Sequence, residues 1–180
     1  MIFATQRFYI RELTANDADD YFSLHGDEEI MRYIRAPKSR DVCDKMLLDH
    51  IAINKILRPF GRWLVFDNMD DSFIGSFVVI PVEGTQKMQL GYSVLKNHWG
   101  KGVATELVGS GLQYIFTNSQ LDFIYAIVED QNIASKKVLV NAGFVANQIM
   151  LDGDKSLVEY IYERDRWTAF QEASTILSDS

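Results

Sequence analysis

A short run of small residues between an expected strand and an expected helix constrains this chain more than any other feature. The segment from Gly91 to Glu106 reads GYSVLKNHWGKGVATE, in which Gly100 and Gly102 separate a strand end from a helical pattern. Backbone amides in the first turn of a helix have no partner within the helix, and glycine lets a bound anion approach the backbone closely. The segment therefore predicts a strand–turn–helix unit whose turn can hold a pyrophosphate group.

The glycine spacing excludes one nucleotide-binding motif and leaves two other interpretations open. A P-loop needs glycine at the position of Leu95 and serine or threonine at that of Gly102. A dinucleotide fingerprint starting at Gly100 would meet Thr105 at its third glycine and has no clear acidic partner about 20 residues on. It remains a weak alternative, and a tight turn without a ligand is the other.

The remaining patterns indicate one domain with a mixed sheet. Strands are expected at 8–12, 63–66, 73–80, 86–95, 123–128, 144–150 and 157–163, and helices from 17, at 27–34, 40–57, 102–117 and 133–142. We expect a single domain over residues 1–165 and a C-terminal tail over 166–180 that can form a short helix. This order of elements is typical of an α/β or α+β fold.

Composition narrows the classes of partner and compartment. The formal net charge of −7 argues against nucleic-acid binding, which needs an excess of Lys and Arg on one face. Cys43 is the only cysteine, so no intrachain disulfide is expected, and we predict that it is a small buried hydrophobe. No basic and apolar leader and no apolar run of about 18 residues is present. We therefore expect a cytoplasmic protein without membrane association.

The glycine-rich segment also resembles a known family. Residues 99–106 (WGKGVATE) look like the acetyl-CoA loop of the GNAT superfamily of N-acyltransferases, and specifically of its RimJ/RimL branch. The superfamily pattern is Arg or Gln, two residues, Gly, one residue, then Gly or Ala, with Trp common in the first place in this branch. Here Trp99, Gly102 and Ala104 occupy those positions. Residues 5–11, 27–33, 132–139 and 142–144 resemble the same branch, so the likeness covers residues 5 to 163.

The resemblance implies a fold, a co-substrate and a set of binding residues. The expected fold is GNAT-like, with a mixed, mostly antiparallel sheet of six to seven strands and about four helices. Acetyl-CoA would be held by main-chain groups of the strand end, by the glycine-rich turn and by Asn132. The implied binding residues are Ser93, Val94, Leu95, Trp99, Gly100, Lys101, Gly102, Val103, Ala104, Thr105 and Asn132. Asn132 also suits a helix N-cap before Ile133, and both roles are compatible.

The catalytic candidates follow from the chemistry of acetyl transfer. By the same resemblance, Ser135 would lie near the thioester sulfur as a proton donor to the leaving thiolate, although alone it reads as an exposed helical serine. Transfer also needs a neutral amine, and at pH 7 about 14% of an α-amine but only ~0.04% of a lysine is neutral. Glu129, at the end of the interior strand, is the first candidate base, with a solvated strand-end charge as its alternative.

Other carboxylates and histidines have weaker cases. Glu159 on the last strand is a further candidate base, whereas Glu106, in the first turn of a helix, is interpreted as structural. Gln89 stands where the branch often carries an acidic residue, which points to a different acceptor or a more acidic amine. The three histidines lack metal-ligand spacing, so no metal site is expected.

The leading hypothesis is an enzyme, an N-acetyltransferase that moves the acetyl group of acetyl-CoA directly to a primary amine. The acceptor would be a protein or peptide α-amine, or a small molecule. The alternatives are a non-catalytic acyl-CoA-binding regulatory module and a dinucleotide-binding oxidoreductase. The acceptor pocket is expected from residues 32–39, the helix from Arg40 and the hairpin at 152–155, whose acidic turn hints at a cationic acceptor. A homodimer is one plausible assembly.

Overall fold

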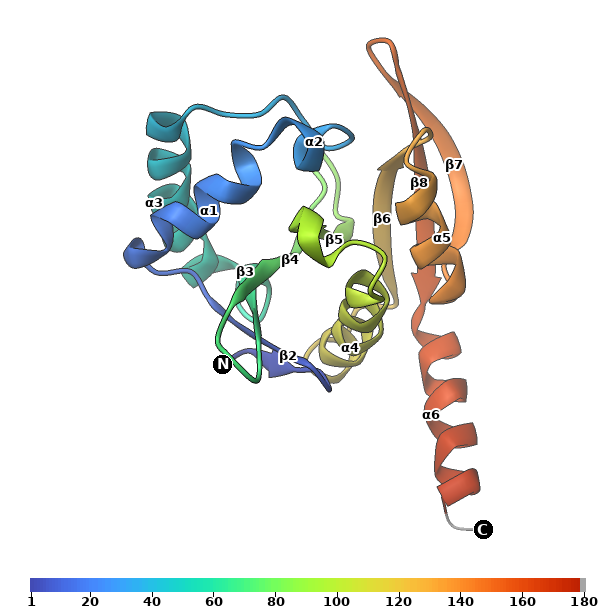
Figure 1. The fold of residues 1–180 in the computed structure, drawn as a ribbon. Coiled ribbons are helices and arrows are strands. Elements are labelled where there is room, and N and C mark those ends of the chain that lie inside the picture. Colours follow the sequence, from blue (N-terminus) through green and yellow to red (C-terminus); the bar gives the residue numbers. More distant parts are fainter. Residues whose placement is uncertain (179–180) are drawn as a thin grey trace.

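One eight-stranded sheet organises the chain, with strand order β1-β2-β3-β4-β5-β6-β8-β7 (Figure 1). The computed structural model describes the backbone of residues 1–178 and the side chains of residues 1–171. Neighbouring strands are antiparallel except β5 and β6, which are parallel. The strands are β1 (Phe3–Ala4), β2 (Phe8–Glu12), β3 (Gly61–Asp67), β4 (Phe73–Pro81), β5 (Met88–Val94), β6 (Phe123–Glu129), β7 (Val145–Asp152) and β8 (Lys155–Glu163).

Six α-helices and two short 3-10 helices accompany the sheet within the described residues. The α-helices are α1 (Ala18–His25), α2 (Glu28–Met31), α3 (Arg40–Leu57), α4 (Val103–Thr117), α5 (Ile133–Asn141) and α6 (Arg164–Ser178); the 3-10 helices are η1 (Ala15–Asp17) and η2 (Lys96–His98). The predicted α/β class with a mixed sheet is confirmed. No helix of the described part is long and apolar enough to cross a membrane.

The structure corrects the expected counts of six to seven strands and about four helices. The additional strand, β1, has only two residues and pairs Phe3 with Ile10, so it is too short to produce a periodic pattern. The helix expected at 27–34 is shorter and ends at Met31. Its start is capped by Asp27, whose Oδ1 accepts hydrogen bonds from the N–H groups of Glu29 and Ile30. Sequence periodicity locates the centre of an element better than its ends.

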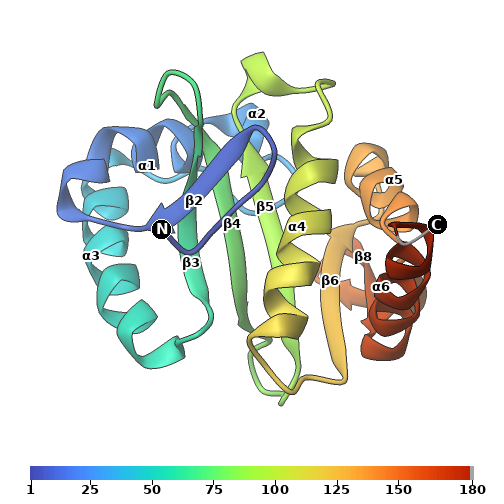
Figure 2. The same ribbon diagram turned by 90° about the horizontal axis from the view of Figure 1, so that it is seen from below.

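Two layers of helices cover opposite faces of the sheet. Figure 2 shows α4 in front of the central strands with α5 and α6 beside it. The main core lies under α4 and α5 and includes Phe77 and Leu107, both fully buried. On the other face, α1 and α3 bury Tyr21, Leu47 and the predicted buried hydrophobe Cys43 against β3. The side chains of each strand alternate between these two layers.

The sheet separates between β5 and β6. Their single registered pair is Gln89 with Tyr125, and the strands diverge beyond it. Main-chain groups in the second half of β5 therefore have no ladder partner on the β6 side. Both α4, after β5, and α5, after β6, begin at the open end of this split.

Candidate active site

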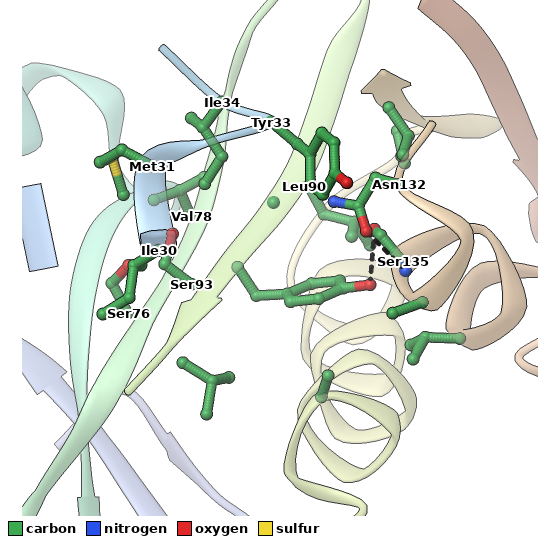
Figure 3. A pocket seen from close by; sticks show the side chains of 18 of the residues that line it. Ile30, Met31, Tyr33, Ile34, Ser76, Val78, Leu90, Ser93, Asn132 and Ser135 are labelled. Atoms are coloured by element: carbon green, nitrogen blue, oxygen red, sulfur yellow. Dashed lines mark hydrogen bonds between the residues drawn. The ribbon is translucent and has the colours of Figure 1, made fainter. Parts of the chain in front are cut away.

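A cleft with a volume of about 970 Å³ passes through the split between β5 and β6. Its lining includes the starts of α4 and α5 and, on the other face of the sheet, residues of α1, α2, α3 and β3. Figure 3 shows Ser76 and Val78 of β4 on one side of this space and Asn132 and Ser135 of α5 on the other. The cleft thus connects the two layers, so two reactants can meet in it from opposite faces.

The glycine-rich turn forms one end of the cleft. Gly100 and Gly102 have φ values of 72° and 75°, in the left-handed region that favours glycine. A Cβ atom on Gly100 would meet no atom within 4 Å, so the turn is open on its outer side. The first helical bond of α4 runs from the N–H of Glu106 to the carbonyl of Gly102. Before it, the N–H groups of residues 103–105 have no partner among the described residues, which makes them available to an anion.

The indole of Trp99 fixes this turn to the strand before it. Trp99 Nε1 donates a hydrogen bond of 2.7 Å to the carbonyl oxygen of Val94, the last residue of β5. The tryptophan therefore stabilises the conformation of the loop between β5 and α4. Its ring is also partly exposed and lines the cleft.

Glu106 anchors the same turn to the N-terminus of the chain. Its carboxylate accepts hydrogen bonds from Thr5 Oγ1, from the backbone N–H of Arg7 and from Arg7 Nε, and Arg7 Nη1 donates to the carbonyl of Lys101 at 3.0 Å. Burial alone would raise the pKa of Glu106, but these hydrogen bonds hold it below its ordinary value. The structural role expected for Glu106 is confirmed.

The first turn of α5 brings two hydroxyl groups together in the cleft. Asn132 Oδ1 accepts a hydrogen bond from the N–H of Ser135 at 3.1 Å, which confirms the expected N-cap. Ser135 Oγ lies 2.9 Å from the hydroxyl oxygen of Tyr92 on β5 (Figure 3). Burial raises the pKa of Tyr92, so this phenol stays protonated at neutral pH. Tyr92 has no motif of its own, and only the placement of β5 against α5 identifies it.

Glu129 lines the cleft at the end of β6, but as half of an ion pair. Lys155 Nζ donates to Glu129 Oε2 at 2.5 Å, and the Glu129 side chain is only 12% exposed. Oε1 has no hydrogen-bond partner among the described residues. One oxygen of the carboxylate therefore remains available for an incoming donor.

Glu159, the second candidate base, is not placed to act as one. It is fully buried, and its carboxylate accepts from Lys87 Nζ at 2.7 and 2.9 Å, from Asn147 at 2.7 Å and from Gln148 at 3.0 Å. Burial would raise the pKa of Glu159, but the bonds from Lys87 and Asn147 lower it. Glu159 does not line the cleft. Its role is structural: from β8, it forms an ion pair with Lys87, the residue before β5.

Of the binding residues implied by the family resemblance, all but Leu95 and Lys101 line the cleft. Leu95 packs against Leu24, Ile30 and Met31, and its N–H donates to the carbonyl of Ile74 in β4. The Lys101 side chain is exposed on the outer side of the turn. Within the described residues, no group of three or more histidine, cysteine, aspartate or glutamate side chains could hold a metal ion.

The part of the cleft on the α1/α3 face contains a group of residues that carry no sequence motif. Four segments contribute residues that line the same space: α1 with Tyr21 and His25, the segment after α2 with Arg35, α3 with His50 and β3 with Arg62. Arg35 and His50 lie in two of the segments expected to shape an acceptor pocket, residues 32–39 and the helix from Arg40. Tyr21, His25 and Arg62 lie outside those segments, and no sequence pattern indicated them.

Comparison with sequence families gives one match that spans most of the chain. Residues 7–145 match the acetyltransferase (GNAT) domain. Among curated proteins, the chain is 29% identical over 155 residues to the uncharacterized N-acetyltransferase p20 of Bacillus licheniformis, with 84% of this chain and 86% of that protein covered. It is 26% identical over 146 residues to the uncharacterized N-acetyltransferase YoaA of Bacillus subtilis, with 79% and 82% covered.

Solved structures of low sequence identity share the fold. A GNAT-family acetyltransferase from Bacillus anthracis superposes with a TM-score of 0.78 at 17% identity, covering 89% of this chain and 97% of that one. The spermidine N-acetyltransferase of Vibrio cholerae, in complex with CoA and spermine, gives 0.76 at 22%, covering 89% and 98%. RimL, a ribosomal L7/L12 alpha-N-protein acetyltransferase in complex with CoA, gives 0.77 at 13%, covering 90% and 97%.

Proposed function

The chain belongs to the GNAT family of acetyltransferases, and from that premise we propose that it transfers the acetyl group of acetyl-CoA directly to a primary amine bound in the cleft. The observation that carries this proposal is the position of the open glycine turn and the Tyr92–Ser135 hydroxyl pair in one continuous cleft. Family membership overturns the oxidoreductase alternative. The spacing of the RimJ/RimL-like motifs supports that branch of the family.

The turn before α4 fits the pyrophosphate of acetyl-CoA. Gly100 and Gly102 leave its outer side open, and the unpartnered amides of residues 103–105 point to an anionic ligand at the helix N-terminus. Ser93, Val94 and Asn132, which line the cleft beside the turn, would hold the pantetheine arm. When bound, acetyl-CoA supplies the activated acetyl thioester.

The hydroxyl pair provides a proton for the departing thiolate. Ser135 Oγ donates its proton to the sulfur, and Tyr92, whose phenol is protonated at neutral pH, donates in turn to Ser135. The direction of donation follows from chemistry, because the thiolate is the group that gains negative charge. Asn132 holds Ser135 in position by capping the same helical turn.

Glu129 accepts the proton that the attacking amine loses. Glu129 lines the cleft, and its Oε1 has no hydrogen-bond partner among the described residues, while Lys155 occupies Oε2. The demand on this base is modest for an α-amine, because an appreciable fraction is already neutral at pH 7. We therefore favour an acceptor α-amine, or a small-molecule amine of similar pKa, over a lysine side chain.

The location of the single cysteine supports direct transfer. Cys43, in α3, is fully buried and does not line the cleft. It is therefore not placed to carry an acetyl group between donor and acceptor.

Two measurements test the proposal. A thermal shift with acetyl-CoA at about 100 times its Kd should add roughly 2.7 kcal/mol of stability, or about 5 to 10 °C, with NADH as the inactive control. Thiol release above background with a panel of amines should follow. A shift without amine-dependent thiol release would identify a non-catalytic acyl-CoA-binding module. No shift at millimolar acetyl-CoA would overturn the proposal.

A further inference from the structure

A basic cluster lies in the cleft on the face opposite α4 and α5. We define it as Arg35, from the segment after α2, and Arg62, from β3, together with His25 of α1 and His50 of α3. Arg62 is held by its backbone: Asn54 of α3 accepts from its N–H at 2.9 Å and donates to its carbonyl at 2.7 Å. The four side chains therefore come from four separately anchored segments.

The two histidines contribute no charge to the basic cluster. Burial, together with the positive charge of the nearby arginines, lowers the pKa of His25 to about 3 and that of His50 to about 4. His25 Nδ1 accepts a hydrogen bond from Arg35 Nη2 at 3.0 Å, as a neutral imidazole can. His50 Nδ1 lies 2.8 Å from the Tyr21 hydroxyl. At neutral pH the charge of the cluster is that of two guanidinium groups.

Neither guanidinium has a carboxylate partner. Within the described residues, Arg35 and Arg62 form no salt bridge, and Arg35 Nε is buried without a hydrogen-bond partner. Burial lowers the pKa of Arg62, and Arg35 lowers it further through charge repulsion. Both side chains are half-buried and line the same cleft, where two like charges without a counter-charge are costly.

The acidic residues that line the cleft do not neutralise the cluster. Glu29 is paired with Lys96 at 3.3 Å, and Glu129 is paired with Lys155. Asp152 is the last residue of β7, at the opposite edge of the sheet from β3, which carries Arg62. The acidic turn at 152–154 had hinted at a cationic acceptor, but the two unpaired arginines favour the opposite charge.

The register of the sheet relates the cluster to the transfer site. Arg62 on β3 is opposite Val78 on β4, and Val78 is opposite Gly91 on β5. Directly paired residues point to the same face, so Arg62 and Val78 share the α1/α3 face of the sheet. Two strand spacings, about 10 Å, separate the backbone of Arg62 from that of β5, where the split begins. A ligand that contacts both regions must span several bonds.

We infer that Arg35 and Arg62 form a binding site for an anionic group of the acceptor, a carboxylate or a phosphate, while the acceptor amine lies at the split between β5 and β6. This inference rests on the proposed function, because it names the substrate class of that same cleft. The planar, multi-donor guanidinium matches both anions through paired hydrogen bonds.

Three peptide probes test the charge preference. They are Ala-Ala-Glu, Ala-Ala-Gln and Ala-Ala-phosphoserine, all with amidated C-termini, so that only the third side chain changes the charge. We expect kcat/KM for the glutamate or the phosphoserine peptide to exceed that of the glutamine peptide by at least tenfold. Whichever anionic peptide is better identifies the source of the anion. Equal values for all three peptides would overturn the inference.

Matched arginine variants locate the effect. Arg62→Gln and Arg35→Gln should raise KM for the anionic peptide at least tenfold, with little change in kcat or in the kinetics of the glutamine peptide. Arg58→Gln is the control, because Arg58 is exposed, pairs with Glu12 and does not line the cleft. A response to the cluster variants no larger than that to Arg58→Gln would contradict the assignment.

A binding measurement separates this inference from the proposed function. With CoA present to occupy the glycine turn, glutarate and inorganic phosphate are titrated at constant ionic strength while the unfolding temperature is followed. At least one anion should stabilise the wild type and the Arg58→Gln variant, but neither Arg62→Gln nor Arg35→Gln. Equal responses in all four proteins would overturn the anion site even if acetyl transfer occurs. A difference confined to the cluster variants would support the site even if no amine is acetylated.

Discussion

The hydroxyl oxygen of Tyr92 lies 2.9 Å from Ser135 Oγ, and this contact joins a strand of the sheet to the first turn of a helix across the cleft. Replacing Ser135 by alanine removes the proton donor that we propose for the departing thiolate. We expect kcat to fall by about 10²-fold, the lower range for loss of a general acid, with KM for acetyl-CoA little changed. Steady-state thiol release measures both quantities.

Tyr92→Phe should have a smaller effect than Ser135→Ala, because in the proposed mechanism the tyrosine acts through the serine. We expect roughly a tenfold loss of kcat. Combining the two substitutions should cost no more than Ser135→Ala alone, as expected for residues that act as a unit. Fully additive losses would show that the two hydroxyls work separately.

The glycine turn gives a prediction with an internal control. Gly100→Ala places a side chain in open space at φ 72°, so only backbone strain, about 1–2 kcal/mol, should destabilise the protein. Gly109→Ala, in the exposed middle of α4, also meets open space but has a helical backbone, and should stabilise by roughly 0.5–1 kcal/mol. Urea unfolding gives both values. Weaker CoA binding is expected for Gly100→Ala and not for Gly109→Ala.

Histidine burial predicts a pH-dependent stability. His25 and His50 have folded-state pKa values of about 3 and about 4, below their ordinary value of 6.5. The unfolded chain therefore binds more protons as the pH falls below 6.5, and the stability present above that pH is lost. Each histidine contributes a slope of about 1.4 kcal/mol per pH unit toward pH 4.

Histidine variants separate the loss of stability caused by histidine protonation from the loss caused by protonation of carboxylates. His25→Gln or His50→Gln should each flatten the pH dependence of stability between pH 6.5 and pH 5. Urea unfolding across the pH range measures the slopes. Parallel curves for wild type and variants would show that the histidines are protonated in the folded protein.

Glu129 makes a prediction about the acceptor amine. Glu129→Gln should reduce kcat/KM more for an amine of high pKa than for one of low pKa, since the latter is more often neutral at pH 7. A series of primary amines at fixed pH gives the comparison. Raising the pH should recover part of the lost rate, because the amine then deprotonates without help. Equal losses across the series would assign Glu129 a role in binding.

Local sequence patterns predicted most elements of the fold, because each reflects periodic burial within a short window. The helix at Arg40–Leu57 and the interior strand at Phe123–Glu129 are examples, with an amphipathic pattern in the first and a short apolar run in the second. The two-residue strand at Phe3–Ala4 depends on a neighbour, β2, for all of its pairing. Such an element has no pattern of its own to find.

The residues of the candidate site show the same difference between local patterns and contacts with distant segments. The glycine turn and Asn132 are recognisable because their chemistry depends on neighbours in the chain, a helix start in each case. Tyr92 and the basic cluster are not, because they acquire their surroundings from segments such as β3 and α3 that meet only in the folded chain. The pairing of Glu159 with Lys87, 72 residues away, likewise removed a candidate base.

The ion pair between Lys87 and Glu159 has a mechanical consequence. Lys87 immediately precedes β5. Its Nζ lies 4.6 Å from the centre of the Tyr125 ring on β6 and forms the ion pair with Glu159 on β8. It therefore spans the sheet beside Gln89 and Tyr125, the one pair that joins β5 to β6. The two halves of the sheet are joined at the Gln89–Tyr125 pair and separate from there toward the carboxyl ends of β5 and β6. The width of the split is therefore set at its closed end, away from the glycine turn and the Tyr92–Ser135 contact at its open end.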